Sequence, residues 1–296
     1  MSKTIKKVKK AILPVAGFGT RFLPATKASP KEMLPIVDKP VIQYLVEQSS
    51  EAGIKDITFV TGRGKRAIED HFDKSFELDH NLVEKGKDDL VKKVREISNL
   101  ARFSYVRQPE PLGDGHAIAC ASHLMGKGEP VLIFFGDTLY DAEPNIAKQV
   151  IEAYDKYQTP IIGLAEVPME DVSNFGVIDG DDVGGGAFRI KGMVEKPKAE
   201  EAPSNLVAVG IYVITSEIFK ILAEMNSGKS GEIRLADAFD IYLQGGGELY
   251  GQKLKGEWLD TGNKFSFIKA TLKLGVKHEE VGGDLKKLIK EMAEGL

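Results

Sequence analysis

Two glycines, a threonine and an arginine follow the first apolar segment of the chain, in the run Leu13-Pro-Val-Ala-Gly-Phe-Gly-Thr-Arg21. Gly17 and Gly19 can adopt positive φ and bring backbone N–H groups close to phosphate oxygens, and Arg21 supplies a planar cation. The run lacks the third glycine of a dinucleotide-binding turn and the Gly-Lys-Ser/Thr of a Walker loop. It predicts a phosphate-binding loop of another kind, or a turn that needs glycine only for its conformation.

A local patch of positive charge continues beyond this loop. Lys27, Lys31 and Lys39 lie in a segment punctuated by prolines, which suits a polyphosphate, although a solvated loop is the alternative. The whole chain carries a formal net charge of -4, from 40 Lys plus Arg and 44 Asp plus Glu. A protein that coats nucleic acid is normally basic, so this class is excluded. Five other lysines, which include Lys3, fall within the first ten residues and are interpreted as incidental.

Two carboxylates and one Glu-Lys pair could complete such a site. Asp137 follows a predicted strand and Asp260 follows a short apolar segment, and a carboxylate in such a position is a natural Mg²⁺ ligand. Glu195 can accept hydrogen bonds from sugar hydroxyls, while Lys196 is a point charge that can reach a sugar phosphate.

A loop rich in proline and glycine could read a base. Gln108 offers an amide donor and acceptor, and Gly113 allows close approach of the backbone. The single cysteine, Cys120, excludes an internal disulfide, and the five histidines show no zinc-ligand spacing.

The elements that must position these residues alternate between strand and helix. This order predicts an α/β fold with parallel strands and helical crossovers, in which ligands bind beyond the carboxyl ends of the strands. We predict two or three helices within 64–100, antiparallel strands after residue 170 and a helical tail over 263–296. The predicted strands are 8–15, 56–61, 103–106, 130–135 and 160–167, and the other predicted helices are 41–49, 118–124 and 146–157.

Several motifs in order give the chain a family resemblance. They are Ala16-Gly-Phe-Gly-Thr-Arg21, Pro30-Lys-Glu-Met-Leu-Pro35, Asp38-Lys-Pro40, His71-Phe-Asp-Lys-Ser-Phe-Glu-Leu78, Gln108 to Ala117, Gly176-Val-Ile-Asp179, Val194-Glu-Lys-Pro-Lys198, Pro203-Ser-Asn205, Gly231 to Ala238 and Asp260-Thr-Gly-Asn-Lys264. The chain resembles the sugar-1-phosphate nucleotidyltransferases over nearly its whole length, and most closely the bacterial UTP–glucose-1-phosphate uridylyltransferases (UDP-glucose pyrophosphorylases).

The resemblance implies the nucleotide-diphospho-sugar transferase fold. This fold has a Rossmann-like mixed, mainly parallel central sheet flanked by helices, with added antiparallel strands and a helical C-terminal tail. We expect one domain over 1–296. Its nucleotide-binding part would span about 8–140, its sugar-binding part about 141–262 and its C-terminal helical segment about 263–296.

The resemblance also implies roles for individual residues. Arg21, Lys31 and Lys196 would be the catalytic cations, and Asp137 and Asp260 would hold Mg²⁺. The nucleotide-binding residues would be Ala16, Gly17, Gly19, Thr20, Glu32, Gln108 and Gly113. The sugar-binding residues would be Gly176, Glu195, Asn205 and Gly210, with Asn205 alternatively holding a strand edge. Many relatives have a second acidic residue where this chain has Thr138, so that position is given no role.

The implied reaction converts UTP and glucose 1-phosphate to UDP-glucose and pyrophosphate. The second pKa of a phosphate monoester is about 6, so the attacking phosphate is already largely a dianion and needs no general base. Thymidylyltransferases and other sugar nucleotidyltransferases would have similar loops, and a non-catalytic nucleotide-sugar sensor is an alternative of another class. A dehydrogenase is excluded, because Thr61-Gly-Arg-Gly-Lys65 supplies no acidic residue after the second strand.

The expected setting is that of a cytoplasmic homo-oligomer. The apolar run over 11–16 is too short for a signal peptide and contains Pro14, and no stretch approaches the roughly 20 apolar residues of a membrane span. The resemblance implies a dimer or tetramer, with the apolar positions of the tail as a contact. We expect neither nucleic acid nor a membrane as a partner.

Overall fold

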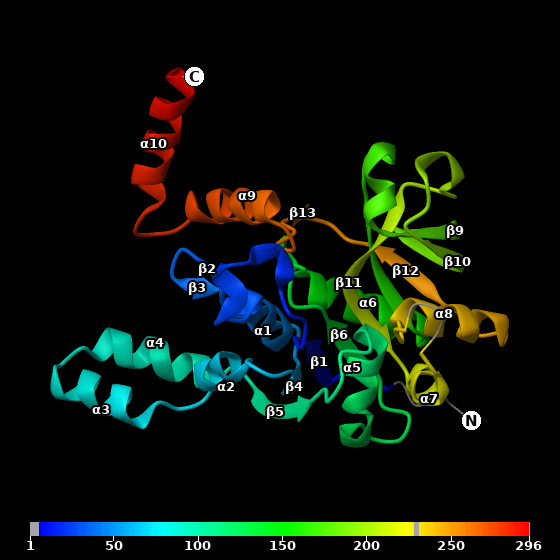
Figure 1. Ribbon diagram of the computed structural model, residues 1–296, viewed down its shortest axis with the longest axis horizontal. Helices are drawn as coiled ribbons and strands as arrows, with labels where there is room; N and C mark the ends of the chain where they lie inside the picture. The colour runs from blue at the N-terminus through cyan, green and yellow to red at the C-terminus, as the bar shows by residue number, and fades with distance from the viewer. Residues whose placement is uncertain (1–5, 228–230, 296) are drawn as a thin grey trace.

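A mixed sheet forms the centre of the computed structural model, which describes residues 6–227 and 231–295 (Figure 1). Lys3 and Leu296 therefore lie outside the described residues. The strand order is β5-β4-β1-β6-β11-β8-β12-β10-β9. These strands are β1 (Lys10–Pro14), β4 (Asp56–Thr61), β5 (Arg102–Arg107), β6 (Val131–Phe134), β8 (Ile161–Glu166), β9 (Gly176–Gly184), β10 (Ala187–Glu195), β11 (Leu206–Ile214) and β12 (Tyr250–Lys253).

Parallel pairing is concentrated in the first half of this sheet. Strands β5, β4, β1 and β6 are joined by parallel pairs, whereas β11 is antiparallel to β6 and β8, and β10 is antiparallel to β12 and β9. Strands β8 and β12 are again parallel. The predicted mixed sheet is therefore confirmed. Because β1, β4 and β6 run in the same direction and in register, the loops that follow them leave from one edge.

Two short ribbons accompany the large sheet. Strands β2 (Pro35–Ile36) and β3 (Lys39–Pro40) form a hairpin after the basic loop, and β7 (Tyr140–Asp141) pairs with β13 (Glu257–Trp258). The second ribbon brings the segment after β6 next to the segment that ends in Asp260. Each ribbon therefore anchors a part of the chain that carries predicted site residues.

Helices cover both faces of the sheet. Side chains alternate along β1, so that Ala11 and Leu13 pack in the cluster with α1 (Val41–Glu51) and α6 (Ile146–Tyr157), while Ile12 faces the other cluster. That second cluster includes residues of α5 (Asp114–Cys120), α7 (Ser216–Glu224) and α8 (Leu235–Gln244). The two-residue alternation places β1 between two helical layers, as the α/β prediction requires.

The segment 64–100 forms three helices, at the upper limit of the prediction. They are α2 (Arg66–Phe72), α3 (Phe76–Glu84) and α4 (Asp88–Ser98), and the last two extend sideways from the sheet as an arm (Figure 1). The tail forms α9 (Lys264–Gly275) and α10 (Gly282–Glu294), and α10 points away from the sheet (Figure 1). The predicted helix over 118–124 is wrong in its bounds. It starts at Asp114, directly after Gly113 with its φ of 102°, and Ser122–Leu124 forms a separate 3-10 turn.

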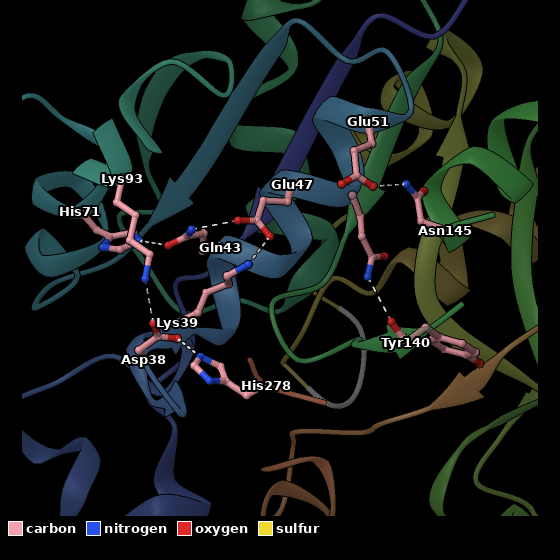
Figure 2. Close-up of polar contacts among 11 residues, drawn as sticks. Asp38, Lys39, Gln43, Glu47, Glu51, His71, Lys93, Tyr140, Asn145 and His278 are labelled. Atoms are coloured by element: carbon pink, nitrogen blue, oxygen red, sulfur yellow. Dashed lines mark hydrogen bonds and ion pairs between the residues drawn. The ribbon is translucent and has the colours of Figure 1, made fainter. Parts of the chain in front are cut away.

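Side chains of α1 tie this helix to its neighbours (Figure 2). Gln43 bonds to Glu47 on the same helix and lies 2.9 Å from Nε2 of His71 in α2, and Glu47 also accepts a bond from Lys39. Asp38, at the turn of the β2–β3 hairpin, contacts Lys93 of α4 and His278 of the tail. The hairpin that follows the basic loop is thus held by both the arm and the tail. Among the described residues, no helix is long and apolar enough to cross a membrane.

Candidate active site

Two adjoining cavities open at the edge where β1 and β6 end. Their volumes are about 480 Å³ and about 520 Å³. Gly113, Asp114, Phe135, Asp137 and Glu232 line both of them. Asp137 therefore stands on the boundary between the two cavities.

Most of the residues predicted to bind the nucleotide line the first cavity. These are Ala16, Gly17, Glu32, Gln108 and Gly113, together with the predicted catalytic Lys31. Gly19 and Thr20 line neither cavity. Gly19 has a φ of 65°, and a Cβ atom there would lie 3.1 Å from Cβ of Lys31. Gly19 therefore allows the loop to turn closely over Lys31, while Thr20 is exposed at the start of a 3-10 turn.

The side of the first cavity that carries Gln108 and Gly113 is held in place by hydrogen bonds and close contacts to the backbone. The Gln108 side-chain amide donates to the Gly113 carbonyl at 2.9 Å, and its nitrogen lies 3.2 Å from Nδ1 of His116. A Cβ atom on Gly113 would lie 2.5 Å from the Ile233 carbonyl oxygen, so only glycine fits. Asp114 accepts a bond from the Leu235 backbone N–H, and burial raises the pKa of Asp114. The amide of Gln108 is consequently held in place before any ligand binds.

The second cavity collects most of the predicted sugar-binding residues. Gly176, Glu195, Lys196 and Gly210 line it, and so do Arg21 and both predicted metal ligands, Asp137 and Asp260. Asn205 does not line it. Its carbonyl oxygen accepts a bond from the Val167 backbone N–H, which places Asn205 at a strand edge, the alternative raised from the sequence.

Lys196 reaches the second cavity through an unusual backbone. Its φ of 47° lies in the left-handed region, and its N–H donates to the Phe175 carbonyl oxygen at 2.9 Å. Its ammonium group lies 3.8 Å from Oε1 of Glu195, and 57% of its side chain is exposed. A solvated cation at the cavity rim can contact an incoming anion without breaking a buried contact.

Lys31 and Asp137 form an ion pair at the boundary of the cavities. Lys31 Nζ lies 2.6 Å from Asp137 Oδ2. Burial by itself would lower the pKa of Lys31, but the charges of Asp137 and Glu32 and the hydrogen bond to Asp137 raise it. Lys31 is therefore protonated at neutral pH, as a phosphate-binding group must be.

The carboxylates of Asp137 and Asp260 converge on one space. The hydroxyl and N–H of Thr261 donate to the Asp137 carbonyl oxygen at 3.0 and 3.2 Å, which joins the two segments. A Cβ atom on Gly262 would lie 3.0 Å from Asp260 Oδ1, 3.4 Å from Asp137 Oδ2 and 3.6 Å from Arg21 Nη1. The absence of a side chain at Gly262 thus keeps open a small space bordered by two carboxylates.

This donor set fits a divalent cation that also binds phosphate. Burial, opposed by the Gly262 N–H and reinforced by the charge of Asp137, raises the pKa of Asp260, so a cation there would relieve an unfavourable environment. The described residues contain no group of three or more His, Cys, Asp or Glu side chains placed to hold a metal. Mg²⁺ commonly binds one or two carboxylates and completes its shell with substrate phosphates and water, so two carboxylates suffice.

Three residues at or beside the site were not assigned to it from the sequence. Lys65 forms a buried ion pair with Glu32, and nothing in its local sequence indicates burial. Trp258 lines the second cavity, and its indole nitrogen is buried without a hydrogen-bond partner in the described part of the chain. Thr138, given no role, also lines this cavity.

The comparison with known families agrees with this geometry. Residues 10–276 match the family model described as nucleotidyl transferase. The chain belongs to this family. Nucleotidyltransferases of this kind generally use a divalent metal ion.

The names of individual relatives are more specific than the description of the family model. The chain is 48% identical over 281 residues to a UTP–glucose-1-phosphate uridylyltransferase of Bacillus subtilis, covering 95% of this chain and 96% of the relative. It is similar to the solved structure of UTP-bound UGPase from Acinetobacter baumannii, with a TM-score of 0.89, 38% identity and coverage of 96% and 99%. A UDP-glucose pyrophosphorylase complexed with UDP-glucose gives a TM-score of 0.83 and 42% identity, covering 92% of this chain and 100% of that one.

Proposed function

We propose that this chain is a UTP–glucose-1-phosphate uridylyltransferase, which converts UTP and α-D-glucose 1-phosphate to UDP-glucose and pyrophosphate. The observation that carries the proposal is the position of Asp137 between two adjoining cavities. The first cavity is lined by the glycine loop and the amide of Gln108, and the second cavity is lined by the cation Lys196 at its rim and by Glu195. Relatives that share nearly the whole chain carry this activity in their names.

The reaction joins two anions, so its difficulty is electrostatic. The sugar phosphate is largely a dianion near pH 7, since its second pKa is about 6, and it can attack the α-phosphate of UTP without a general base. The new bond forms between a sugar-phosphate oxygen and the α-phosphorus, while the bond from that phosphorus to the bridging oxygen of pyrophosphate breaks. Positioning and neutralisation of charge supply the catalysis.

The chain's own residues divide this work between the two cavities. Arg21 and Lys31 would contact the triphosphate and the leaving pyrophosphate, and Lys196 would hold the sugar phosphate. Gln108 and the backbone of Gly113 would read the base. Asp137 and Asp260 would hold Mg²⁺, which neutralises phosphate charge when bound.

The same arrangement supports the proposed division of the single domain. Residues 8–140 contribute most of the first cavity, and residues 141–262 contribute much of the second. The division is not strict, because Arg21 lines the second cavity and Glu232 lines the first. A chain that builds its reaction site from both parts supports one catalytic unit, with 263–296 as an appended helical segment.

A steady-state assay of pyrophosphate release tests the proposal. UTP with glucose 1-phosphate should be the preferred pair, and dTTP with the same sugar phosphate should react more slowly. Preference for dTTP would support a thymidylyltransferase, and binding without pyrophosphate release would support a nucleotide-sugar sensor. A covalent nucleotidyl-enzyme trapped with labelled UTP would contradict direct displacement.

We also propose that the protein is a cytoplasmic homo-oligomer, a dimer or a tetramer. The tail supports a contact between copies, because Phe265, Ile268 and Met292 are 78%, 58% and 61% exposed. Light scattering of the full chain tests the oligomeric state, and cell fractionation tests the location. A monomer at micromolar concentration would refute the proposed oligomeric state.

A further inference from the structure

The most deeply buried ion pair of the described residues joins Glu32, which lines the first cavity, to Lys65, which has no place in the mechanism above. Lys65 Nζ lies 2.7 Å from Glu32 Oε2, with the two side chains 6% and 1% exposed. In every other ion pair of this part of the chain, both partners are at least 21% exposed. A charge pair removed from water is costly and needs an explanation.

Lys65 reaches this position through the turn between β4 and α2. This turn contains the motif Thr61-Gly-Arg-Gly-Lys65, which the proposed function leaves unused. A Cβ atom on Gly62 would lie 3.0 Å from the Ala16 carbonyl oxygen, so the turn packs directly against the loop that lines the first cavity. Lys65 is therefore presented to the site from behind that loop.

Glu32 is confined from the other side. A Cβ atom on Gly136 would lie 2.9 Å from Cγ of Glu32 and 3.2 Å from Val15, so the glutamate stem packs closely between the ends of β1 and β6. The side chain of Glu32 is 1% exposed, so the charge of its carboxylate depends on a cation among the groups around it.

Two lysines lie within electrostatic reach of Glu32. Lys65 is bonded to it, and Lys31, the preceding residue in the chain, is bonded to Asp137 instead. Electrostatic interactions between Glu32 and Lys31 and between Lys31 and Lys65 couple the two ion pairs. Each lysine thus has its own carboxylate, and the four charges alternate across the floor of the site.

We propose that Lys65 is a positioning residue, which neutralises Glu32 and so leaves Lys31 free to contact Asp137 and the phosphates of UTP. Removal of Lys65 would leave a buried carboxylate without its cation. Lys31 would then turn toward Glu32 and away from the phosphates. The inference rests on the proposed function, because it assigns UTP as the ligand that Lys31 serves.

Four variants of the full chain test this role by calorimetric titration with UTP. They are Lys65→Met, Glu32→Gln, the double variant and Arg66→Met as a matched control, because Arg66 is the adjacent residue and pairs with Asp70 at the exposed surface. We expect Lys65→Met to weaken UTP binding by about tenfold or more, which corresponds to about 1.4 kcal/mol. Glu32→Gln serves as the reference for the double variant, because Glu32 lines the first cavity and is itself predicted to bind the nucleotide, and Arg66→Met should have no effect.

The decisive measurement is the double variant. Without the carboxylate of Glu32, nothing diverts Lys31, so UTP affinity should return to within about threefold of the Glu32→Gln value. The KM for glucose 1-phosphate should stay within about twofold of wild type in every variant that folds. A double variant that binds UTP clearly more weakly than Glu32→Gln would overturn the proposal, because the loss of Lys65 would then act in the absence of the carboxylate that is proposed to divert Lys31.

The remaining outcomes of the UTP titrations also test the proposal. Wild-type affinity in Lys65→Met would overturn the proposal. If Lys65→Met does not fold, the comparison between the double variant and Glu32→Gln carries the test, since neither leaves an unpaired buried carboxylate. Failure of the wild-type chain to bind UTP would instead refute the proposed function.

Discussion

Lys31 and Asp137 are 106 positions apart in the sequence, yet their charged atoms lie 2.6 Å from one another at the boundary of the two cavities. The pair joins the loop after β1 to the loop after β6, and it exists because these parallel strands end at the same edge. It places a cation and an anion where the two substrates of the proposed reaction would meet. A change to either partner should therefore act on chemistry before it acts on folding.

The substitution Asp137→Asn should lower kcat/KM by about a thousandfold, as loss of a preorganised charge in an active site commonly does. It removes one proposed metal ligand and the partner of Lys31 but keeps the size of the side chain. The midpoint of thermal unfolding should change little, because 31% of the side chain is exposed. Asp141→Asn is the matched control, since Asp141 pairs with Lys277 away from the cavities. Near-normal turnover in Asp137→Asn would remove this residue from the mechanism.

The substitution Lys196→Ala should raise the KM for glucose 1-phosphate and lower kcat, with a combined loss of about a hundredfold or more. The expected cause is loss of the cation that orients the sugar phosphate. The affinity for UTP, measured by titration, should stay near wild type. Lys198→Ala provides the comparison, because Lys198 is an exposed lysine paired with Glu201. Equal losses in both lysine variants would contradict a specific role for Lys196.

The substitution Asp260→Asn should raise the metal concentration needed for half-maximal turnover by about tenfold, the scale of a weakened metal site. Direct binding of Mn²⁺, followed by electron paramagnetic resonance with UTP present, should weaken in parallel. Removal of metal with a chelator should stop turnover of the wild-type chain and should be reversed by Mg²⁺. Asp284→Asn, in the exposed tail, is the control. An unchanged metal requirement would show that Asp260 is not a ligand.

Stability should decrease in mild acid because of His71. Burial lowers the pKa of His71, against the opposing charge of Glu47. The folded chain therefore binds the proton less readily than the unfolded chain. The contribution of His71 to stability is complete above its ordinary pKa of about 6.5 and is lost as the pH falls from there through the lowered value.

Chemical denaturation at several pH values checks this expectation. His71→Asn should flatten the pH dependence of the free energy of unfolding between neutral and mildly acidic pH. Its partner in the structure is the Gln43 side chain (Figure 2). His80→Asn, on the exposed arm, should leave the slope unchanged. A slope that persists in His71→Asn would assign the acid sensitivity to another group.

The sequence predicts those features that local patterns encode. The apolar runs locate the strands of the parallel half, and the position of Asp137 after one of them follows from the pattern directly. The convergence of Asp260 on the same space depends on the β7–β13 ribbon, which no local pattern indicates. The local pattern indicates Asp260 as a possible metal ligand, but the sharing of one metal ion with Asp137 is predicted only through the family resemblance.

Lys65 marks the limit of what local patterns indicate. A lysine in a glycine-rich turn is normally solvated, and its burial results from the packing of Gly62 on Ala16 and from a partner 33 positions earlier in the chain. Asn205 shows a different limit, because its motif belongs to the family pattern and leaves two roles open, and the residue does not line the second cavity. Both outcomes are set by tertiary packing.

Gly210 limits how the substrate range of this protein can be redesigned. A methyl group at this position would collide with Thr138 and Phe135, while the Gly210 carbonyl accepts a bond from the Phe135 N–H. Side chains of Thr138 and Phe135 already fill the space beside Gly210, so no side chain can be introduced at this position to narrow the second cavity without displacing them. Engineering toward another sugar phosphate therefore has to begin with residues such as Glu195 and Trp258, whose side chains border the cavity.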